Sequence, residues 1–150
     1  MRIVIQRVKS ASVEVDGEVV SSIGSGLLIL LGIEASDDQS DIEWLTQKVA
    51  KLRIFDDEQG VMNLDITQVQ GQALVVSQFT LQASTKKGNR PSYIKAAPEA
   101  ISRPLYLSFV EALSTKLGRE VPTGIFGADM QISLVNNGPV TILIDSKNRE

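Results

Sequence analysis

A Gly-Pro pair at residues 138 and 139 interrupts an otherwise apolar stretch near the end of the chain. It separates the mostly apolar run Met130–Val135 from Ile142–Ile144. Proline has no N–H to donate to a central sheet ladder, so the pair predicts a turn, a bulge or an edge strand. An X-Pro bond can also be cis, as in about 5–6% of folded cases, usually in tight turns.

The residues around this pair are polar. Asn136, Asn137 and Thr141 flank it, and a bend of this kind presents fixed carbonyl and amide groups that suit a small polar ligand. The alternative interpretation is an ordinary Asn-Gly hairpin turn between two strands.

A second polar segment ends an apolar strand. Residues 73–81 begin with Ala-Leu-Val-Val and continue as Ser77-Gln78-Phe79-Thr80-Leu81. The pattern predicts a strand whose carboxyl end turns polar, which is a common place for a site. Period-two alternation places Ser77 and Phe79 on one face and Gln78 and Thr80 on the other.

A third segment is basic and rich in turn formers. It contains Lys86, Lys87, Arg90 and one aromatic residue, Tyr93. The whole chain has a formal net charge of −3, yet residues 84–103 hold five cations against the single acid Glu99. A basic loop beside a pocket can contact phosphates, while acidic surface elsewhere suppresses non-specific binding. The alternative is an ordinary solvated loop.

The residue types that are missing narrow the chemistry. The 150 residues include no cysteine and no histidine. This excludes disulfides, thiolate zinc sites, cysteine nucleophiles, histidine bases and histidine-bound metals. The remaining options are carboxylates, lysine, tyrosine, hydroxyls, main-chain dipoles or a group on the substrate. For an enzyme, this set favours main-chain electrostatics or substrate assistance.

The length predicts one domain over residues 1–150. The start Met1–Val4 enters a strand pattern without a signal-peptide core. No apolar run approaches the roughly 18 residues that a membrane-spanning helix needs. We therefore expect a cytoplasmic protein without a membrane partner.

The hydrophobic periodicity predicts an α+β fold, a mostly antiparallel, barrel-like sheet with two helices. Asp-Gly at 16–17 predicts a hairpin turn. The strand patterns cover residues 2–15, 18–22, 27–33, 53–55, 73–81, 132–135 and 140–145.

Two segments have helical spacing. A capping box from Ser36 to Gln39 predicts a helix over about 37–51. A second helix begins at Pro98 or Pro104 and ends at Gly118. Its predicted buried stripe is Leu105, Phe109, Leu113 and Leu117.

Four motifs occur in a fixed order along the chain: Ser77–Leu81, Gly88–Ser92, Phe126–Met130 and Asn136-x-Gly138-Pro139-x-Thr141. Together they resemble one family, the D-aminoacyl-tRNA deacylases, and the resemblance covers essentially the whole chain. One position departs from the family pattern, because residue 93, commonly phenylalanine there, is tyrosine here. The change keeps the ring and adds a hydroxyl that needs a partner or water.

The resemblance implies hydrolysis of the ester that joins a D-amino acid, or glycine, to the terminal adenosine of tRNA. The products would be free tRNA and free amino acid, and L-aminoacyl-tRNA would be rejected. In the family the Gly-Pro bond is cis and its carbonyls hold the substrate ammonium, a role that falls here on Gly138 and Pro139. That clamp comes from the partner subunit, so the resemblance implies a homodimer with two composite sites.

The resemblance also assigns the other site residues. Ser77 and Gln78 would position the ribose, and amides near Phe79 and Thr80 would stabilise the oxyanion. Phe126 and Met130 would hold the adenine by stacking and sulfur contact. The cations Lys86, Lys87 and Arg90 would meet acceptor-stem phosphates. No cofactor and no metal are expected.

Thr80 is the obvious candidate nucleophile, but nothing in the sequence offers it a base. Substrate assistance by the ribose 2′-hydroxyl is therefore the expected route. Two other classes remain open. The first is a non-catalytic dimeric module that binds RNA or a small ligand. The second is a metal-dependent hydrolase, although no ligand spacing stands out among the carboxylates.

Overall fold

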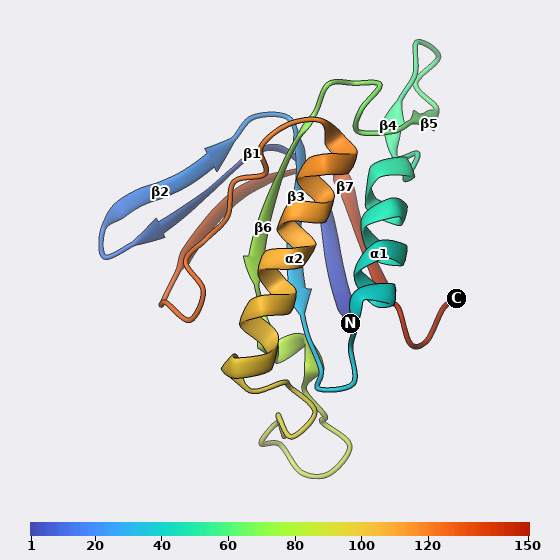
Figure 1. Cartoon of the computed structure of the whole chain (residues 1–150). Coiled ribbons are helices and arrows are strands. Elements are labelled where there is room, and N and C mark those ends of the chain that lie inside the picture. Colours follow the sequence, from blue (N-terminus) through green and yellow to red (C-terminus); the bar gives the residue numbers. More distant parts are fainter.

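A strongly curved sheet forms the frame of the molecule, and two helices cover one of its faces (Figure 1). The computed structural model describes all residues, Met1–Glu150. The elements in chain order are β1 (Arg2–Val15), β2 (Glu18–Ile23), β3 (Gly26–Gly32), α1 (Gln39–Lys51), β4 (Phe55–Asp56), β5 (Met62–Leu64), β6 (Gln72–Ser77), the 3₁₀ helix η1 (Phe79–Gln82), α2 (Glu99–Leu117) and β7 (Gln131–Asp145).

The long strand β1 organises the sheet. Its first half pairs with β3, its second half pairs with β2, and β7 runs antiparallel along its other edge. The outer pair β3–β6 is parallel, while the other pairs are antiparallel. The predicted α+β fold with a mostly antiparallel, barrel-like sheet and two helices is confirmed.

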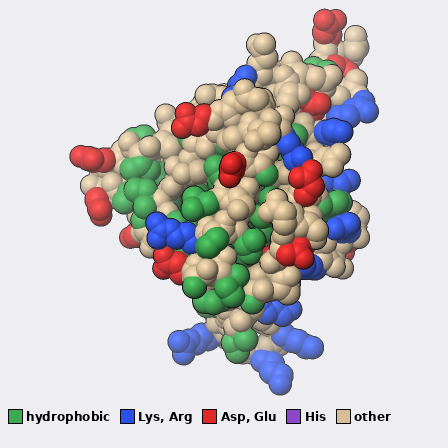
Figure 2. All heavy atoms as spheres, in the orientation of Figure 1, with side chains coloured by type: hydrophobic (Ala, Val, Ile, Leu, Met, Phe, Trp, Pro, Cys, Tyr) green, Lys and Arg blue, Asp and Glu red, His purple; other side chains and the backbone are tan.

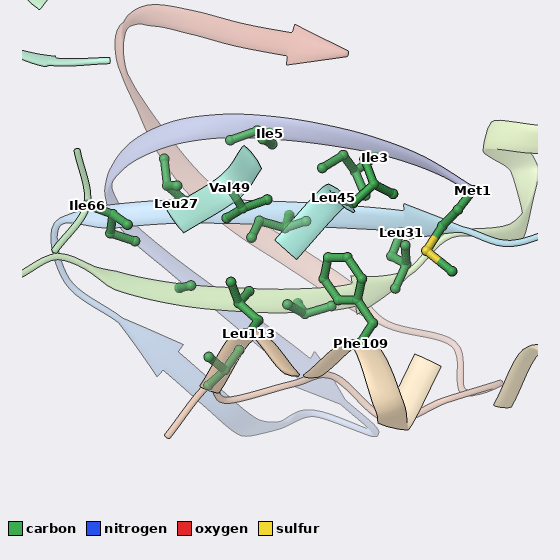
Figure 3. Close-up of a cluster of buried hydrophobic side chains, with 14 of the residues drawn as sticks. Met1, Ile3, Ile5, Leu27, Leu31, Leu45, Val49, Ile66, Phe109 and Leu113 are labelled. Carbon is green, nitrogen blue, oxygen red and sulfur yellow. The ribbon is translucent and has the colours of Figure 1, made fainter. Parts of the chain in front are cut away.

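The main core lies between the sheet and the helices. Strand residues such as Ile3, Ile5 and Leu27 meet Leu45 and Val49 of α1 and Phe109 of α2 (Figure 3). A smaller apolar cluster fills the opposite side, where the second half of β1 and β2 curl over β3 and β6. Apolar residues on both sides of the sheet explain why β3 reads as one continuous hydrophobic run.

Helix α1 begins two residues later than the sequence predicted. Asp38 is the N-cap, and its side chain accepts a hydrogen bond from the Ser40 amide at 2.8 Å. Asp41 completes the capping box by accepting from the Asp38 amide at 2.9 Å. The predicted box from Ser36 to Gln39 is therefore wrong, because the Ser36 hydroxyl is hydrogen-bonded to the Glu34 carboxylate at 2.9 Å.

Helix α2 resolves the choice between two starting prolines. Pro98 is its N-cap, Pro104 lies inside the helix, and Gly118 ends it in the left-handed conformation at φ 66°. Phe109 and Leu113 of the predicted stripe are buried, whereas Leu105 and Leu117 are only partly so. The buried face of the helix is slightly rotated from the predicted stripe. Tyr106, one turn before Phe109, and Ser102, two turns before it, are also buried.

Strand β7 continues through the Gly-Pro pair. The sequence predicted separate strands over 132–135 and 140–145, but one strand spans both. The pairing with β1 is irregular around Val8, so this part of β7 is a bulge and the hairpin interpretation is wrong. Pairing with β1 alone makes β7 an edge strand, where proline is tolerated. None of the helices combines the length and apolar character that a bilayer crossing requires.

Candidate active site

The segment that carries Phe79 and Thr80 is a 3₁₀ helix rather than the end of a strand. Strand β6 stops at Ser77 and η1 begins at Phe79, so the predicted strand over 73–81 is too long and its facing pattern does not hold. The absence of a side chain at Gly32 allows this turn: a Cβ there would lie 2.8 Å from the Leu81 Cβ. The buried Gln82 amide also donates to the Gly32 carbonyl at 3.1 Å, which ties η1 to the end of β3.

A cavity of about 390 Å³ opens beside this segment, between the carboxyl end of β6 and the first turns of α2. Five predicted site residues line it together: Ser77, Gln78, Phe79, Phe126 and Met130. Most of its lining is apolar, and its polar side chains come from the end of β6, at Ser77 and Gln78, and from the start of α2, at Glu99 and Ser102. The cavity therefore suits a flat apolar group with one polar edge.

Phe126 reaches the cavity because its segment runs beside β6. The Val75 amide donates to the Pro122 carbonyl at 3.1 Å, and the Gly124 amide donates back to the Val75 carbonyl at 3.2 Å. The Met130 side chain packs directly on Gly124, because a Cβ there would lie 2.5 Å from the Met130 sulfur. These contacts place Phe126 and Met130 on the same cavity.

Tyr106 forms part of the wall behind Phe126. The two ring centroids are 5.4 Å apart, and the Tyr106 hydroxyl donates to the Val75 carbonyl at 3.1 Å. Burial raises the pKa of Tyr106 to about 12, so the phenol stays protonated and cannot serve as a base near neutral pH. Tyr106, Ser102 and Glu99 line the cavity but were not predicted as site residues.

Thr80 lies beside the cavity rather than in its lining. Its hydroxyl oxygen accepts a hydrogen bond from the Gln78 side-chain amide. A carboxamide cannot remove the hydroxyl proton, so the geometry offers Thr80 no base. The N-cap residue Gln78 makes no capping bond to the first amides of η1. The start of a helix leaves such amides without intrahelical acceptors, which keeps them available to an oxyanion.

The Gly-Pro bulge of β7 is not part of the cavity lining. The Gly138-Pro139 bond is cis, and both residues are exposed on β7. Asn136 spans the bulge, because its side chain accepts from the Val140 amide at 2.8 Å and donates to the Thr141 hydroxyl at 3.2 Å. None of these residues lines the cavity of their own chain. The single chain thus does not place the bulge on the cavity that Ser77, Gln78 and Phe79 line.

Arg7 holds the backbone of the bulge by a hydrogen bond, and this role was not predicted from the sequence. It is buried, and its Nε donates to the Asn137 carbonyl at 2.8 Å. Its other contacts are the Ile54 carbonyl at 2.6 Å and the Asp56 carboxylate at 3.2 Å. A buried arginine with three partners orients the Gly138 backbone. The only sequence signal was a charge inside the alternation of β1.

The basic segment is a loop at one end of the molecule. Ser84 and Ser92 close it with two backbone hydrogen bonds of 2.8 and 2.9 Å. Lys86, Lys87 and Arg90 are exposed on it. Figure 2 shows Lys and Arg side chains projecting from the end where Figure 1 places this loop, with hydrophobic atoms between them.

The fold and the cavity define a class of protein: an α+β half-barrel with a pocket at the carboxyl end of its parallel strand pair, lined for a flat apolar group and edged by hydroxyls and amides. The family model described as D-Tyr-tRNA(Tyr) deacylase matches residues 4–145. The chain belongs to this family.

Individual relatives agree over the full length. A D-aminoacyl-tRNA deacylase of Flavobacterium psychrophilum is 62% identical over 150 residues, covering all of both chains. One from Bacteroides thetaiotaomicron is 63% identical, again over all of both chains. A solved structure described as c-Myc DNA Unwinding Element Binding Protein has a TM-score of 0.92 at 41% identity, and the match covers 97% of this chain and 98% of that one.

Proposed function

We propose that this protein hydrolyses the ester bond of D-aminoacyl-tRNA and of mischarged glycyl-tRNA, releasing tRNA and the free D-amino acid or glycine. The observation that carries the proposal is the full-length similarity to D-aminoacyl-tRNA deacylases. A cavity lined by Ser77, Gln78, Phe79, Phe126 and Met130 supports it. L-aminoacyl-tRNA is rejected, which makes the reaction chiral proofreading.

In the proposed complex, the terminal adenine lies between Phe126 and Met130, where an aromatic ring and a thioether face the same cavity. Ser77 and Gln78 hold the ribose at the polar end. The first amides of η1, at Phe79 and Thr80, stabilise the negative charge that develops on the ester oxygen. The ribose 2′-hydroxyl activates the attacking water, and no cofactor takes part.

The clamp for the substrate ammonium comes from a second copy of the chain. Gly138 and Pro139 are exposed and lie away from the cavity of their own protomer. A two-fold homodimer can bring the bulge of one protomer to the cavity of the other. Asn136 and Thr141 fix the backbone of the bulge, so a rigid carbonyl pair leaves room on only one side of the α-carbon.

Lys86, Lys87 and Arg90 bind phosphates of the acceptor stem, because these exposed cations lie on one strongly basic loop. Since the substrate is tRNA in use for translation, the proposed location is the cytoplasm.

A second candidate is a non-catalytic module that binds nucleic acid. It is favoured by the description of the 41% identical structure as a DNA unwinding element binding protein. In that case the cavity and the basic loop would bind a nucleotide without cleaving an ester.

The deciding experiment incubates the purified protein with D-tyrosyl-, L-tyrosyl- and glycyl-tRNA and follows release of the amino acid. We expect rapid release from the D-tyrosyl and glycyl substrates and none from the L-tyrosyl substrate. Binding without release would favour the non-catalytic module. Loss of activity in a chelator, restored by a divalent metal, would favour a metal-dependent hydrolase.

A further inference from the structure

Two exposed aromatic rings meet at the mouth of the cavity. The ring centroids of Phe79 and Tyr93 are 5.1 Å apart, with their planes inclined at 70°. Phe79 is 58% exposed and Tyr93 is 40% exposed, and Phe79 also lines the cavity. Adjacent exposed aromatic rings beside a cavity are a candidate binding surface.

Both rings stand on backbone that is held in place. Tyr93 follows directly after the Ser84–Ser92 pairing that closes the basic loop, and its carbonyl accepts from the Ala96 amide at 3.0 Å. Phe79 begins η1, which Gln82 ties to β3. A ligand that stacks on this pair therefore orders little additional chain when it binds.

The surroundings of the pair point to a nucleic acid strand. Ile94, next to Tyr93, is 94% exposed. The segment from 84 to 95 contains four cations, Lys86, Lys87, Arg90 and Lys95, and no acid. Aromatic rings beside a cationic track are the elements that bind unpaired nucleotides, since rings stack on bases while cations follow the phosphates.

We propose that Phe79 and Tyr93 form an aromatic platform for the unpaired base that precedes the terminal adenosine of the substrate. This inference rests on the proposed function, which puts the terminal adenine in the cavity. Phe79 is shared between the cavity and the platform, so the strand leaves the cavity over Phe79, stacks its next base on Tyr93 and continues toward the basic loop. The platform thus identifies a single-stranded 3′ end, which a free nucleoside ester lacks.

The test compares two small substrates, D-tyrosyl-adenosine and its cytidylyl-(3′,5′)-adenosine counterpart, which adds only the penultimate nucleotide. For the parent protein we expect kcat/KM to be about tenfold higher on the dinucleotide, as base–aromatic stacking can supply. The gain should lie mainly in KM. Tyr93→Ala and Tyr93→Leu should lose the gain and cleave D-tyrosyl-adenosine at the parent rate, whereas Tyr93→Phe should retain it.

Two controls separate stacking from charge. A dinucleotide whose cytosine is replaced by an abasic ribose should lose the gain, because the phosphate alone remains. In the triple variant Lys86→Ala, Lys87→Ala, Arg90→Ala, tRNA binding should depend less on salt, whereas Tyr93→Ala should weaken tRNA binding without changing its salt slope. Tyr93→Leu keeps an apolar contact with Phe79, so it tests the ring without emptying the site.

The inference is overturned if the abasic dinucleotide keeps the gain, if Tyr93→Ala keeps it, or if the parent shows none. Equal slowing of Tyr93→Ala on both substrates would also overturn it, since Tyr93 would then act only by supporting Phe79 in the reaction site. A binding measurement covers the case in which no ester is cleaved and the proposed function itself fails. Fluorescence of 2-aminopurine at the penultimate position of tRNA should be quenched by the parent and Tyr93→Phe, but not by Tyr93→Ala.

Discussion

At the scale of single residues, the catalytic question concerns Thr80. Its hydroxyl accepts a hydrogen bond from the Gln78 side-chain amide, and it has no hydrogen bond to a carboxylate or an amine that could act as a base. An unactivated hydroxyl is a weak nucleophile at neutral pH. The ribose 2′-hydroxyl, by contrast, lies next to the ester in every substrate molecule.

We therefore expect Thr80→Ala to retain turnover. Loss of a positioning contact costs about 1–1.5 kcal/mol, or about tenfold in rate. A substrate with a 2′-deoxy terminal adenosine should react roughly 10²–10⁴-fold more slowly, as expected when general acid–base help is lost. Single-turnover rates of the parent, Thr80→Ala and the control Thr80→Ser would measure both effects. An inactive Thr80→Ala with normal cleavage of the deoxy substrate, or a trapped acyl-Thr80, would establish covalent catalysis instead.

Sequence reasoning found some cavity residues and missed others for a physical reason. Phe79, Phe126 and Met130 lie in motifs that stand out locally, and they do line one cavity. Tyr106 and Arg7 stand in ordinary helix and strand patterns. Their positions at the cavity and the bulge depend on how α2 packs against β6 and how β7 bulges against β1, which are contacts between distant parts of the chain.

At the scale of elements, strands were easier to predict than their ends. Alternation located β1 well, because alternate residues of its first half are buried, and the Asp16-Gly17 turn located the start of β2. The carboxyl end of β6 was misjudged, since η1 depends on the bare backbone of Gly32 in another strand. The capping residue of α1 was displaced by the competing Ser36–Glu34 hydrogen bond.

The parallel pairing of β3 and β6 depends on Gly26. A Cβ at this residue would lie 1.8 Å from the Gln72 carbonyl oxygen, a backbone atom that cannot move without breaking the pairing. Gly26→Ala should lower the free energy of unfolding by about 3 kcal/mol or more and the melting temperature by roughly 6–12 °C. Gly24→Ala is the matched control, since its Cβ would meet only the Gln72 side chain at an ordinary 3.5 Å. Equal melting temperatures for the two variants would show that the strands can separate at no cost.

At the scale of the whole molecule, one ionic cluster joins the two ends of the chain to α1. The Met1 ammonium donates a hydrogen bond to the Asp37 carboxylate, and the Lys147 ammonium donates to the Asp41 carboxylate at 2.8 Å. Burial alone would raise the pKa of Asp41, but hydrogen bonds from Lys147, Ser146 and the Asp38 amide outweigh it and lower the pKa to about 2. Burial raises the pKa of the neighbouring Asp37, which opposes part of this effect.

Asp41 should therefore make stability depend on acid. Its pKa is about 2 when folded and about 3.9 when unfolded. The carboxylate contributes about 2.6 kcal/mol at neutral pH, and most of this is lost as the pH falls from about 4 to about 2. Urea titrations should find Asp41→Asn less stable than the parent at pH 7 and similar to it at pH 2. Glu58→Gln, on an exposed turn, should match the parent at both values. A deficit for Asp41→Asn that persists unchanged at pH 2 would mean that the loss is steric.

The largest-scale prediction concerns the composite site. Gly138 does not line the cavity of its own chain, and the proposed homodimer would supply it from the second protomer. Phe126→Ala should disable the cavity. Gly138→Ala should displace the clamp, because the new Cβ would lie 2.7 Å from Val140 and 3.2 Å from the Arg7 guanidinium.

In a mixed dimer, one site then carries both changes and the other carries neither. Random mixing of the two inactive variants should restore about a quarter of the parent activity per protomer under two-fold symmetry. Mixing Phe126→Ala with Met130→Ala is the control, and it should restore nothing, since both residues belong to one cavity. If both mixtures stay inactive while size measurements show exchange of protomers, the clamp and the cavity belong to the same chain.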